Sequence, residues 1–237
     1  MLLSKYGEKK IGSYTNFMCY CKKNKLSPGY VTVVLIMQLL WWFGIHGPNV
    51  MGAVTGPFMT KMMAQNLELY QAGEGITASG VFYTAGSKYS IIANPFASGW
   101  FGPTGSGITM GLIIAIMLFS KRDDFKAIAK LSIPCGIFNI NEPIIFGIPM
   151  VMDAMFAVPF FLTPVACVCC GYLVQYLGLC PLFVIDVPWT TPVGLFGFLA
   201  SSGNIMGAIW QVVIILGVST LIYTPFVIAS NRQTEEA

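Results

Sequence analysis

The chain has 237 residues, of which 55% are hydrophobic and 10% are charged, and its formal net charge is +3. An average soluble domain carries about 25% charged residues, so this composition excludes a disordered chain and argues against a water-soluble fold. The small net charge gives no indication of nucleic-acid binding. We therefore predict an all-α polytopic membrane protein, in which each crossing needs about 20 residues.

The N-terminal segment is polar and basic, with six lysines opposed by a single acid, Glu8. Basic residues are attracted to the anionic inner leaflet of a membrane, so residues 1–29 are predicted to be a cytoplasmic or interfacial segment. An apolar run at 30–45 predicts the first membrane crossing. We expect residues 30–231 to form one transmembrane domain and residues 232–237 to form a cytoplasmic tail.

Further apolar runs follow along the chain. Residues 46–106 are mixed, and breaks such as Gly56-Pro57 favour an additional hairpin within them. Uninterrupted apolar runs at 107–120, 154–178 and 205–228 predict three more crossings. Together with 30–45, the sequence therefore predicts four transmembrane helices.

Two other apolar segments, 133–150 and 182–201, are interrupted by prolines and by polar residues such as Glu142 and Asp186. In hydrocarbon each unpaired backbone group costs several kcal/mol, so broken backbone is tolerated where it lines protein or a watery cavity. We therefore predict that both segments are re-entrant hairpins. Full crossing by both would also fit the distribution of charges, which does not decide between the two alternatives.

The positions of the basic residues predict the orientation. Residues 121–130 contain four of the thirteen basic residues, and Arg232 lies near the C-terminus. Short loops rich in Lys and Arg stay on the cytoplasmic side. We therefore expect both termini and residues 121–130 to be cytoplasmic, with the four crossings alternating in direction.

The seven cysteines are an odd number, and most lie in apolar surroundings, where free cysteine behaves as a small hydrophobe. A structural zinc site needs several Cys or His ligands at a suitable spacing. The chain has one histidine and no second cysteine pair at such a spacing. We therefore expect neither a metal nor a cofactor.

The most informative polar group is Asn139-Ile140-Asn141-Glu142-Pro143. Ionisable residues at membrane depth usually mark a ligand site or a pathway. Amide side chains both donate and accept hydrogen bonds, and a carboxylate accepts strongly from a hydroxyl, so this group suits a sugar. The structural alternative is that Glu142 caps the hairpin or lies at the cytoplasmic interface.

Two further positions are candidate ligand contacts. His46 follows the first apolar run and could hold a hydroxyl beside a carboxylate or relay a proton; alternatively it is an interfacial histidine bonded to freed carbonyls. In Val187-Pro188-Trp189-Thr190-Thr191-Pro192, the Trp189 indole could stack on a sugar and Thr190 could bind its hydroxyls. The alternative here is an interfacial tryptophan.

Three motifs in this order resemble those of one family: WFGIHG at 42–47, NINEPIIFG at 139–147 and VPWTTP at 187–192. From about residue 30 onward the chain resembles enzyme IIC, the membrane subunit of bacterial phosphoenolpyruvate-dependent sugar phosphotransferase systems. The similarity is to the lactose, cellobiose and diacetylchitobiose group.

The resemblance implies a permease subunit of the bacterial cytoplasmic membrane that binds a disaccharide and carries it inward. A partner, enzyme IIB, would then phosphorylate the sugar from a phosphocysteine, with enzyme IIA as a further partner. Because the phosphoryl donor is on the partner, it stays open whether the chain itself is an enzyme. Site residues implied by the motifs are Glu142 on the reacting sugar, His46 beside it, and Asn139, Asn141, Trp189 and Thr190 around the pocket.

The resemblance also implies a homodimer in which a substrate domain moves in an elevator-like manner against an interface domain. Members of the family are longer and have additional N-terminal helices that include the dimer interface. We therefore expect the chain to correspond to the C-terminal, substrate-binding half of such a subunit.

Two other functions stay open at this point. An ion-coupled secondary sugar transporter would use Glu142, Asp153 and Asp186 as proton sites. A non-autonomous fragment would work only with a separate N-terminal half. An intramembrane hydrolase is less favoured, because one histidine without a His-Glu-x-x-His pattern does not supply a catalytic zinc site.

Overall fold

The computed structural model describes residues 28–77, 80–84, 87–148 and 150–235. Nearly all of the predicted basic segment 1–29 lies outside these residues. The described chain is helical, with one two-stranded antiparallel sheet that pairs Ile76 with Val81. The elements are α2 (Pro28–Trp42), α3 (Gly47–Gln71), β1 (Ile76–Thr77), β2 (Gly80–Val81), α4 (Asn94–Trp100), α5 (Met110–Phe119), α6 (Asp123–Ile137), α7 (Glu142–Gly147), α8 (Ala154–Tyr176), α9 (Leu195–Ala200), α10 (Ile205–Val212), the π-helix η2 (Val213–Val218) and α11 (Ser219–Glu235).

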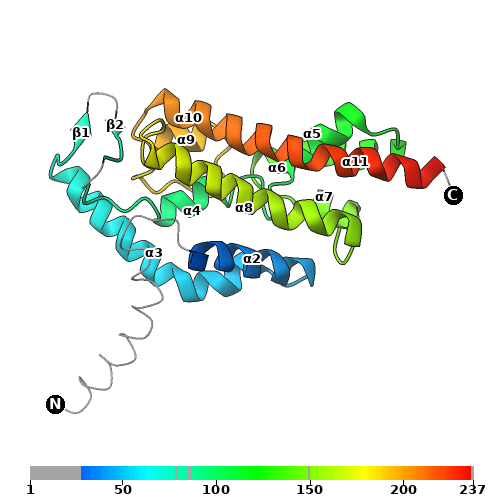
Figure 1. The fold of residues 1–237 in the computed structure, drawn as a ribbon, viewed down its shortest axis with the longest axis horizontal. Coiled ribbons are helices and arrows are strands. Elements are labelled where there is room, and N and C mark those ends of the chain that lie inside the picture. The colour runs from blue at the N-terminus through cyan, green and yellow to red at the C-terminus, as the bar shows by residue number, and fades with distance from the viewer. Residues whose placement is uncertain (1–27, 78–79, 85–86, 149, 236–237) are drawn as a thin grey trace, which may run out of the picture.

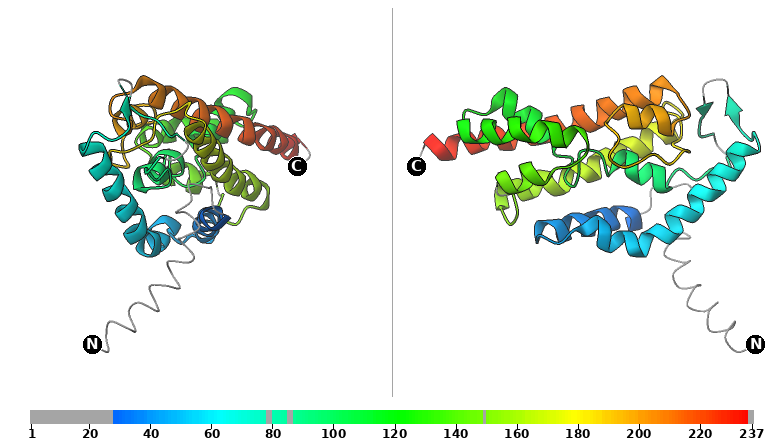
Figure 2. Two further views of the ribbon diagram at one scale, coloured as in Figure 1. Left: turned by 60° about the vertical axis from the view of Figure 1, so that its left-hand side comes forward. Right: turned by 180° about the vertical axis from the view of Figure 1, so that it is seen from behind.

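The molecule is elongated, and its longest helices run along its length (Figure 1). The chain continues without a break through α10, η2 and α11, and α8 lies beside this rod in the opposite direction (Figure 2). Ala154–Tyr176 and Ile205–Asn231 are long and apolar enough to cross a bilayer, so two of the four predicted crossings are present as full-length helices. The helices α2 and α5 have 15 and 10 residues, and at 1.5 Å per residue neither reaches across about 30 Å of hydrocarbon.

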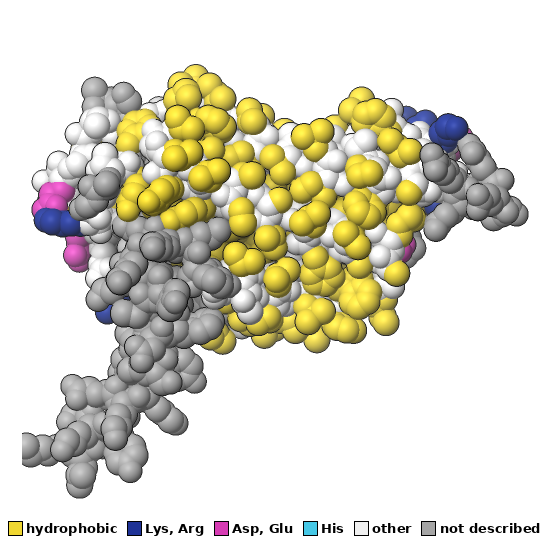
Figure 3. All heavy atoms as spheres, viewed as in Figure 1, with side chains coloured by type: hydrophobic (Ala, Val, Ile, Leu, Met, Phe, Trp, Pro, Cys, Tyr) yellow, Lys and Arg dark blue, Asp and Glu magenta, His cyan; other side chains and the backbone are white. Residues whose placement is uncertain are grey.

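Charged and apolar side chains are separated along the long axis. In Figure 3 the charged atoms gather at the two ends and hydrophobic side chains cover the face between them. Leu118, Leu131 and Leu221 are between 66% and 77% exposed. Exposed apolar surface of this extent marks contact with a membrane or another protein, and the two-ended charge pattern is that of a membrane-embedded body.

One end of the molecule contains both the basic residues at 121–130 and the C-terminal part of α11. The Asn231 side chain donates to the Phe119 carbonyl at 3.0 Å and accepts from the Lys121 backbone N–H at 2.9 Å. This contact joins the end of α5 to α11, so residues 121–130 and the C-terminal part of α11 lie together. We refer to this end as the basic end.

Residues 121–130 are mostly helical, whereas the sequence suggested a loop. Asp123 and Asp124 occupy the first turn of α6, where negative charge is favoured by the helix dipole. The Arg122 guanidinium donates to the Asp124 carboxylate at 2.6 Å and lies 3.6 Å from the centre of the Phe125 ring. Its hydrogen bond lowers the pKa of Asp124. These local charge interactions therefore favour a helix, α6, that begins at Asp123 directly after Lys121 and Arg122.

The first apolar run, 30–45, does not cross in the predicted manner. Four alternating crossings require it to run in the same direction as 154–178, but α2 runs opposite to α8 (Figure 1), and Trp42 packs edge-on against Phe161 in the first half of α8. After Trp42 the chain turns at Gly44, which has φ +79°. Here the chain reverses into α3, so α2 and α3 form a helical hairpin, and the predicted alternation is wrong for this segment.

The two broken segments each contain a reversal of the chain. Segment 133–150 consists of the end of α6, a turn and α7, and both α6 and α8, which flank it, start at the basic end (Figure 2). In segment 182–201 an extended stretch precedes α9, and the backbone N–H groups of Val184 and Ile185 both donate to the Ala200 carbonyl. Each segment is therefore folded back on itself.

The core comprises two clusters along the axis. One surrounds Trp100, which stacks on Phe183 with ring centroids 5.2 Å apart, and the other surrounds Phe156 and Tyr223. Tyr223 donates to the Gly107 carbonyl at 2.8 Å. These clusters fix the turns between α4 and α5 against α8 and α11, and so form one wall of the cavity described next.

Candidate functional site

A cavity of about 780 Å³ lies where the α2–α3 hairpin faces the turns around α4 and the turn between α6 and α7. This volume is within the range of about 300–1,000 Å³ that is usual for small-molecule sites. Five of the six predicted site residues border it. The predicted residues on the cavity are His46, Asn139, Asn141, Glu142 and Trp189; Thr190 is half-buried and is not among the lining residues.

Glu142 is half-buried at the first position of α7, directly after Asn141, the residue that precedes the helix. A carboxylate is favoured in the first turn of a helix, which explains part of its placement. Among the described residues, no group donates a hydrogen bond to this carboxylate and no basic side chain pairs with it. It therefore borders the cavity as an acceptor that is available to a ligand.

His46 precedes α3 and caps it: its Nδ1 accepts from the Asn49 backbone N–H at 3.2 Å. Because Nδ1 is an acceptor, the neutral imidazole carries its proton on Nε2. The structural alternative from the sequence was a bond to freed carbonyls, but the observed backbone partner is an N–H group. His46 thus offers an Nε2–H donor on the rim of the cavity.

Asn139 holds three turns together. Its Oδ1 accepts from the Thr104 backbone N–H at 2.7 Å, and its Nδ2 donates to the carbonyls of Trp189 at 2.5 Å and Thr191 at 2.9 Å. Asn139 has φ +66°, a conformation that asparagine tolerates better than most residues. Its amide hydrogens are both engaged with the protein, so the side chain positions the cavity wall.

The Asn141 side chain also connects two turns of the chain. Its Nδ2 donates to the Ser106 carbonyl at 2.6 Å, and the side chain is 3% exposed. Gly105 makes this contact sterically feasible, since a Cβ at that position would lie 2.2 Å from the Asn141 side chain. The two asparagines therefore join the turn between α6 and α7 to the turn between α4 and α5.

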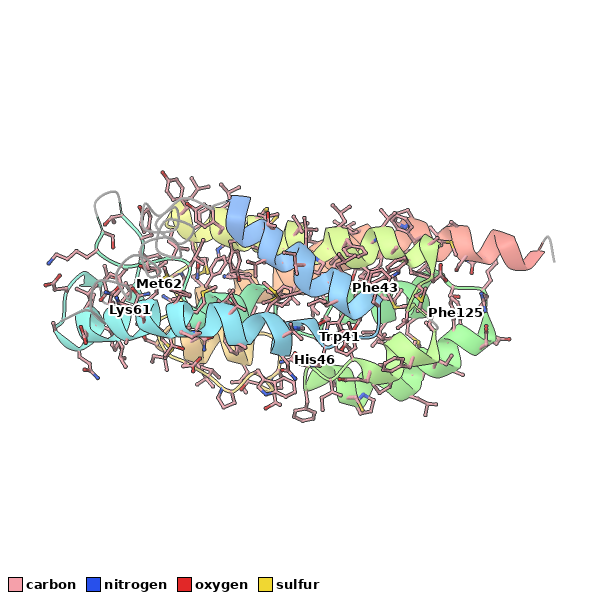
Figure 4. The ribbon with its side chains drawn as sticks, turned by 90° about the horizontal axis from the view of Figure 1, so that it is seen from below. Trp41, Phe43, His46, Lys61, Met62 and Phe125 are labelled. Atoms are coloured by element: carbon pink, nitrogen blue, oxygen red, sulfur yellow. The ribbon has the colours of Figure 1, made fainter. Side chains whose placement is uncertain are left out.

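Trp189 is 60% exposed and borders the cavity from the extended stretch before α9. Trp41 was not predicted to be a site residue, because a tryptophan at the end of an apolar run is typical of a membrane interface. Trp41 is instead 5% exposed, lines the cavity, and has its ring centroid 4.9 Å from that of His46. The two residues lie close together near the middle of the long axis (Figure 4).

The other acids singled out by the sequence lie away from Glu142. Asp153 accepts from the backbone N–H groups of Met155 and Phe156 and caps α8. Asp186 is exposed and accepts from Asn94 Nδ2 at 3.2 Å. Neither aspartate lines the cavity. Among the described residues there is no group of three or more His, Cys, Asp or Glu side chains that could hold a metal ion.

Comparison with known proteins identifies the family that has this fold. The family model described as "Phosphotransferase system, EIIC" matches residues 11–164. The chain belongs to this family of integral membrane permeases. It is similar to the crystal structure of the transporter ChbC, the IIC component from the N,N'-diacetylchitobiose-specific phosphotransferase system, with a TM-score of 0.78 and 34% identity. That match covers 88% of this chain and 46% of ChbC.

Several curated relatives carry similar names. The chain is 38% identical to the cellobiose-specific EIIC component of Lactococcus lactis and 34% identical to the oligo-beta-mannoside-specific EIIC component of Bacillus subtilis. It is 33% identical to the lactose-specific EIICB component of Lacticaseibacillus casei. These matches cover 86%, 84% and 85% of this chain and 43%, 42% and 33% of the relatives. The chain therefore spans less than half the length of the relatives it matches.

Proposed function

We propose that the chain forms the sugar-binding part of a phosphotransferase-system permease, which binds a disaccharide and presents one of its hydroxyls for phosphorylation. The observation that carries this proposal is that Glu142, His46 and Trp189, from three separate segments, border one cavity. A carboxylate accepts from a hydroxyl, an imidazole N–H donates to a sugar oxygen, and an indole stacks on the C–H face of a ring. The names of the relatives, which include cellobiose, lactose and diacetylchitobiose, support a disaccharide.

In this proposal Glu142 accepts the hydrogen bond of the reacting hydroxyl and takes its proton as the oxygen attacks phosphorus, as a general base does. The phosphoryl group comes from a phosphocysteine of a partner, enzyme IIB, which enzyme IIA phosphorylates in turn. His46 donates its Nε2–H to a neighbouring sugar oxygen and fixes the orientation of the ring. Asn139 and Asn141 hold the turns that carry Glu142 and Trp189. Thr190 lies between Trp189 and Thr191, whose carbonyls accept from Asn139.

The proposed arrangement in the membrane follows from the distribution of charge. The basic end faces the cytoplasm, because four basic residues lie at 121–130 and such segments are retained inside. Segments 133–150 and 182–201 are re-entrant, and their broken backbone lines a protein-enclosed cavity as the membrane requires. The cavity-bearing body then moves as a substrate domain of a bacterial cytoplasmic-membrane homodimer.

An ion-coupled transporter gains no support from the site. In that alternative Asp153 and Asp186 would act with Glu142 as proton sites. Asp153 is instead engaged as a helix cap and Asp186 with Asn94, so neither lies on the cavity with Glu142. Phosphorylation-coupled uptake accounts for a single carboxylate at the site.

Replacing Glu142 tests the proposal. In the purified chain in lipid nanodiscs, Glu142→Gln is expected to reduce the affinity for cellobiose or diacetylchitobiose by about ten- to a hundredfold. A hydrogen bond to a charged group contributes about 1.5–3 kcal/mol, and 1.4 kcal/mol is tenfold in affinity. The matched control is Glu68→Gln, at an exposed position of α3 that does not line the cavity. Unchanged affinity in Glu142→Gln, or equal losses in both variants, would contradict the proposal.

A further inference from the structure

The outward side of α6 changes from basic to apolar along its length. One face of the helix is buried and consists of residues at helical spacing: Phe125, Ala129, Ser132 and Gly136. The other side carries first Lys126 and Lys130 and then Leu131, Pro134 and Ile137. Lys126 is half-buried and the other four are exposed, Leu131 to 77%. Two cations and an apolar strip therefore follow one another on the same side of one helix.

Neither lysine forms an ion pair within the described part of the chain. Asp124 is engaged by the Arg122 guanidinium, and Asp123 is exposed and pairs with neither lysine. The positions three and four residues from Lys130 in both directions hold no acid. Lys126 and Lys130 are four residues apart, so their side chains are neighbours on the helix surface and repel each other. An anion placed between the two ammonium groups would be stabilised by both.

These lysines lie at the end of the apolar surface. The helix α6 starts at the basic end, and Leu118 and Phe119, at the end of α5, are 66% and 45% exposed there. Lys126 and Lys130 are separated by about 6 Å along the helix at 1.5 Å per residue. The headgroup region on each side of the hydrocarbon is about 5–8 Å thick. The two ammonium groups therefore match the depth of the lipid phosphates, and the residues from Leu131 onward continue into the hydrocarbon.

We propose that Lys126 and Lys130 bind the phosphate of an anionic phospholipid whose acyl chain lies along Leu131, Pro134 and Ile137. Charge complementarity selects this ligand, because basic groups at the cytoplasmic surface attract anionic headgroups, whereas a zwitterionic headgroup carries its own cation beside the phosphate. The bound lipid holds the start of α6 at the level of the headgroups. This inference goes beyond the proposed function and stands whether or not the cavity binds a sugar.

The test compares two lipids with the same acyl chains and different headgroup charge. Native mass spectrometry of the detergent-solubilised chain measures the dissociation constants of dioleoylphosphatidylglycerol and dioleoylphosphatidylcholine. The unchanged chain is expected to bind the anionic lipid at least about tenfold more tightly. Each lysine near an anionic headgroup contributes about fivefold in affinity. The double variant Lys126→Gln/Lys130→Gln is therefore expected to lose at least about tenfold for the anionic lipid and to stay within about twofold for the zwitterionic one.

Two further variants separate the charged contact from the apolar one. Leu131→Gln is expected to weaken both lipids by about threefold, because it removes apolar contact with the acyl chain. The matched control is Lys61→Gln/Lys88→Gln, which removes two exposed lysines away from the basic end (Figure 4) and is expected to leave both affinities unchanged. Unfolding in lipid-free detergent is expected to be the same for the unchanged chain and Lys126→Gln/Lys130→Gln, since glutamine is a good helix former.

Three outcomes would overturn the lipid site. The first is equal affinity of the unchanged chain for both lipids, or equal losses in the double variant and its control. The second is competition by soluble glycerol phosphate at the affinity of the lipid, which would assign the lysines to a free anion. The third is a double variant that keeps its lipid affinity but supports slower sugar phosphorylation by enzyme IIB, which would assign the lysines to that partner.

Discussion

His46 performs two tasks with its two ring nitrogens. Nδ1 accepts from the Asn49 N–H at the start of α3, and this bond leaves the proton of the neutral ring on Nε2, at the cavity. The helix cap therefore fixes both the tautomer and the orientation of the group that we propose to donate to the sugar. Asparagine is a good residue for capping a helix but is too short to reach a ligand as the imidazole does.

The two tasks can be separated by substitution. His46→Asn is expected to keep the stability of the chain while weakening sugar affinity by about tenfold, the value of a lost hydrogen bond of about 1.4 kcal/mol. His46→Ala is expected to weaken affinity by a similar factor and also to cost about 1 kcal/mol of stability through the lost cap. Binding isotherms and denaturant unfolding in detergent measure the two effects. Full affinity in His46→Asn would show that the imidazole is not a sugar ligand.

The NINEP motif illustrates what a motif alone can and cannot reveal about individual residues. Its amides and carboxylate line one cavity together with His46 and Trp189. Their separate tasks were not predictable, because amides match a sugar and a carbonyl equally well. The partners of Asn139, which are the backbone of Thr104, Trp189 and Thr191, lie far away in sequence and become visible when the turns are brought together.

At the scale of elements, the α2–α3 hairpin depends on a close backbone approach at its turn. A Cβ at Gly47 would lie 2.0 Å from the Met37 carbonyl oxygen, and this backbone atom cannot move aside without separating the two helices. Gly47→Ala is therefore expected to lower the free energy of unfolding by about 1–3 kcal/mol. Denaturant titration measures this change in the free energy of unfolding. Gly52→Ala, on the same helix with open space, is the control and should be neutral or stabilising by up to about 1 kcal/mol; a neutral Gly47→Ala would contradict the close packing.

The long apolar runs predicted full-length spans, whereas the short runs at 30–45 and 107–120 form helices that are too short to span a membrane. The runs at 154–178 and 205–228 appear as α8 and as the α10–η2–α11 rod, because a run longer than about 20 residues has few alternatives in a membrane protein. The run at 30–45 is also apolar, yet it forms one arm of a hairpin. Its direction relative to α8 involves packing such as that of Trp42 on Phe161, and neither a charge count nor hydropathy reports such packing.

For the whole molecule, the separation of charge between the two ends predicts a fixed orientation. In a variant whose native cysteines are replaced by serine, Asp123→Cys at the basic end is expected to react with a membrane-impermeant thiol reagent from the cytoplasmic side. Gln71→Cys, at the end of α3, is expected to react from the opposite side. Both positions are exposed. Labelling of right-side-out and inverted vesicles distinguishes the sides, and reaction of both positions from one side would exclude the proposed orientation.

Asn139 has a mechanical consequence for the whole molecule. A single side chain connects the turn before α5 to the stretch that carries Trp189, and it belongs to the turn that carries Glu142. Separating any two of these three segments would break a hydrogen bond of the Asn139 side chain. A sugar bound among these segments would therefore move together with all of the residues that contact it. Its release would require the cavity to open at its edge, because separating the walls would break the hydrogen bonds of Asn139.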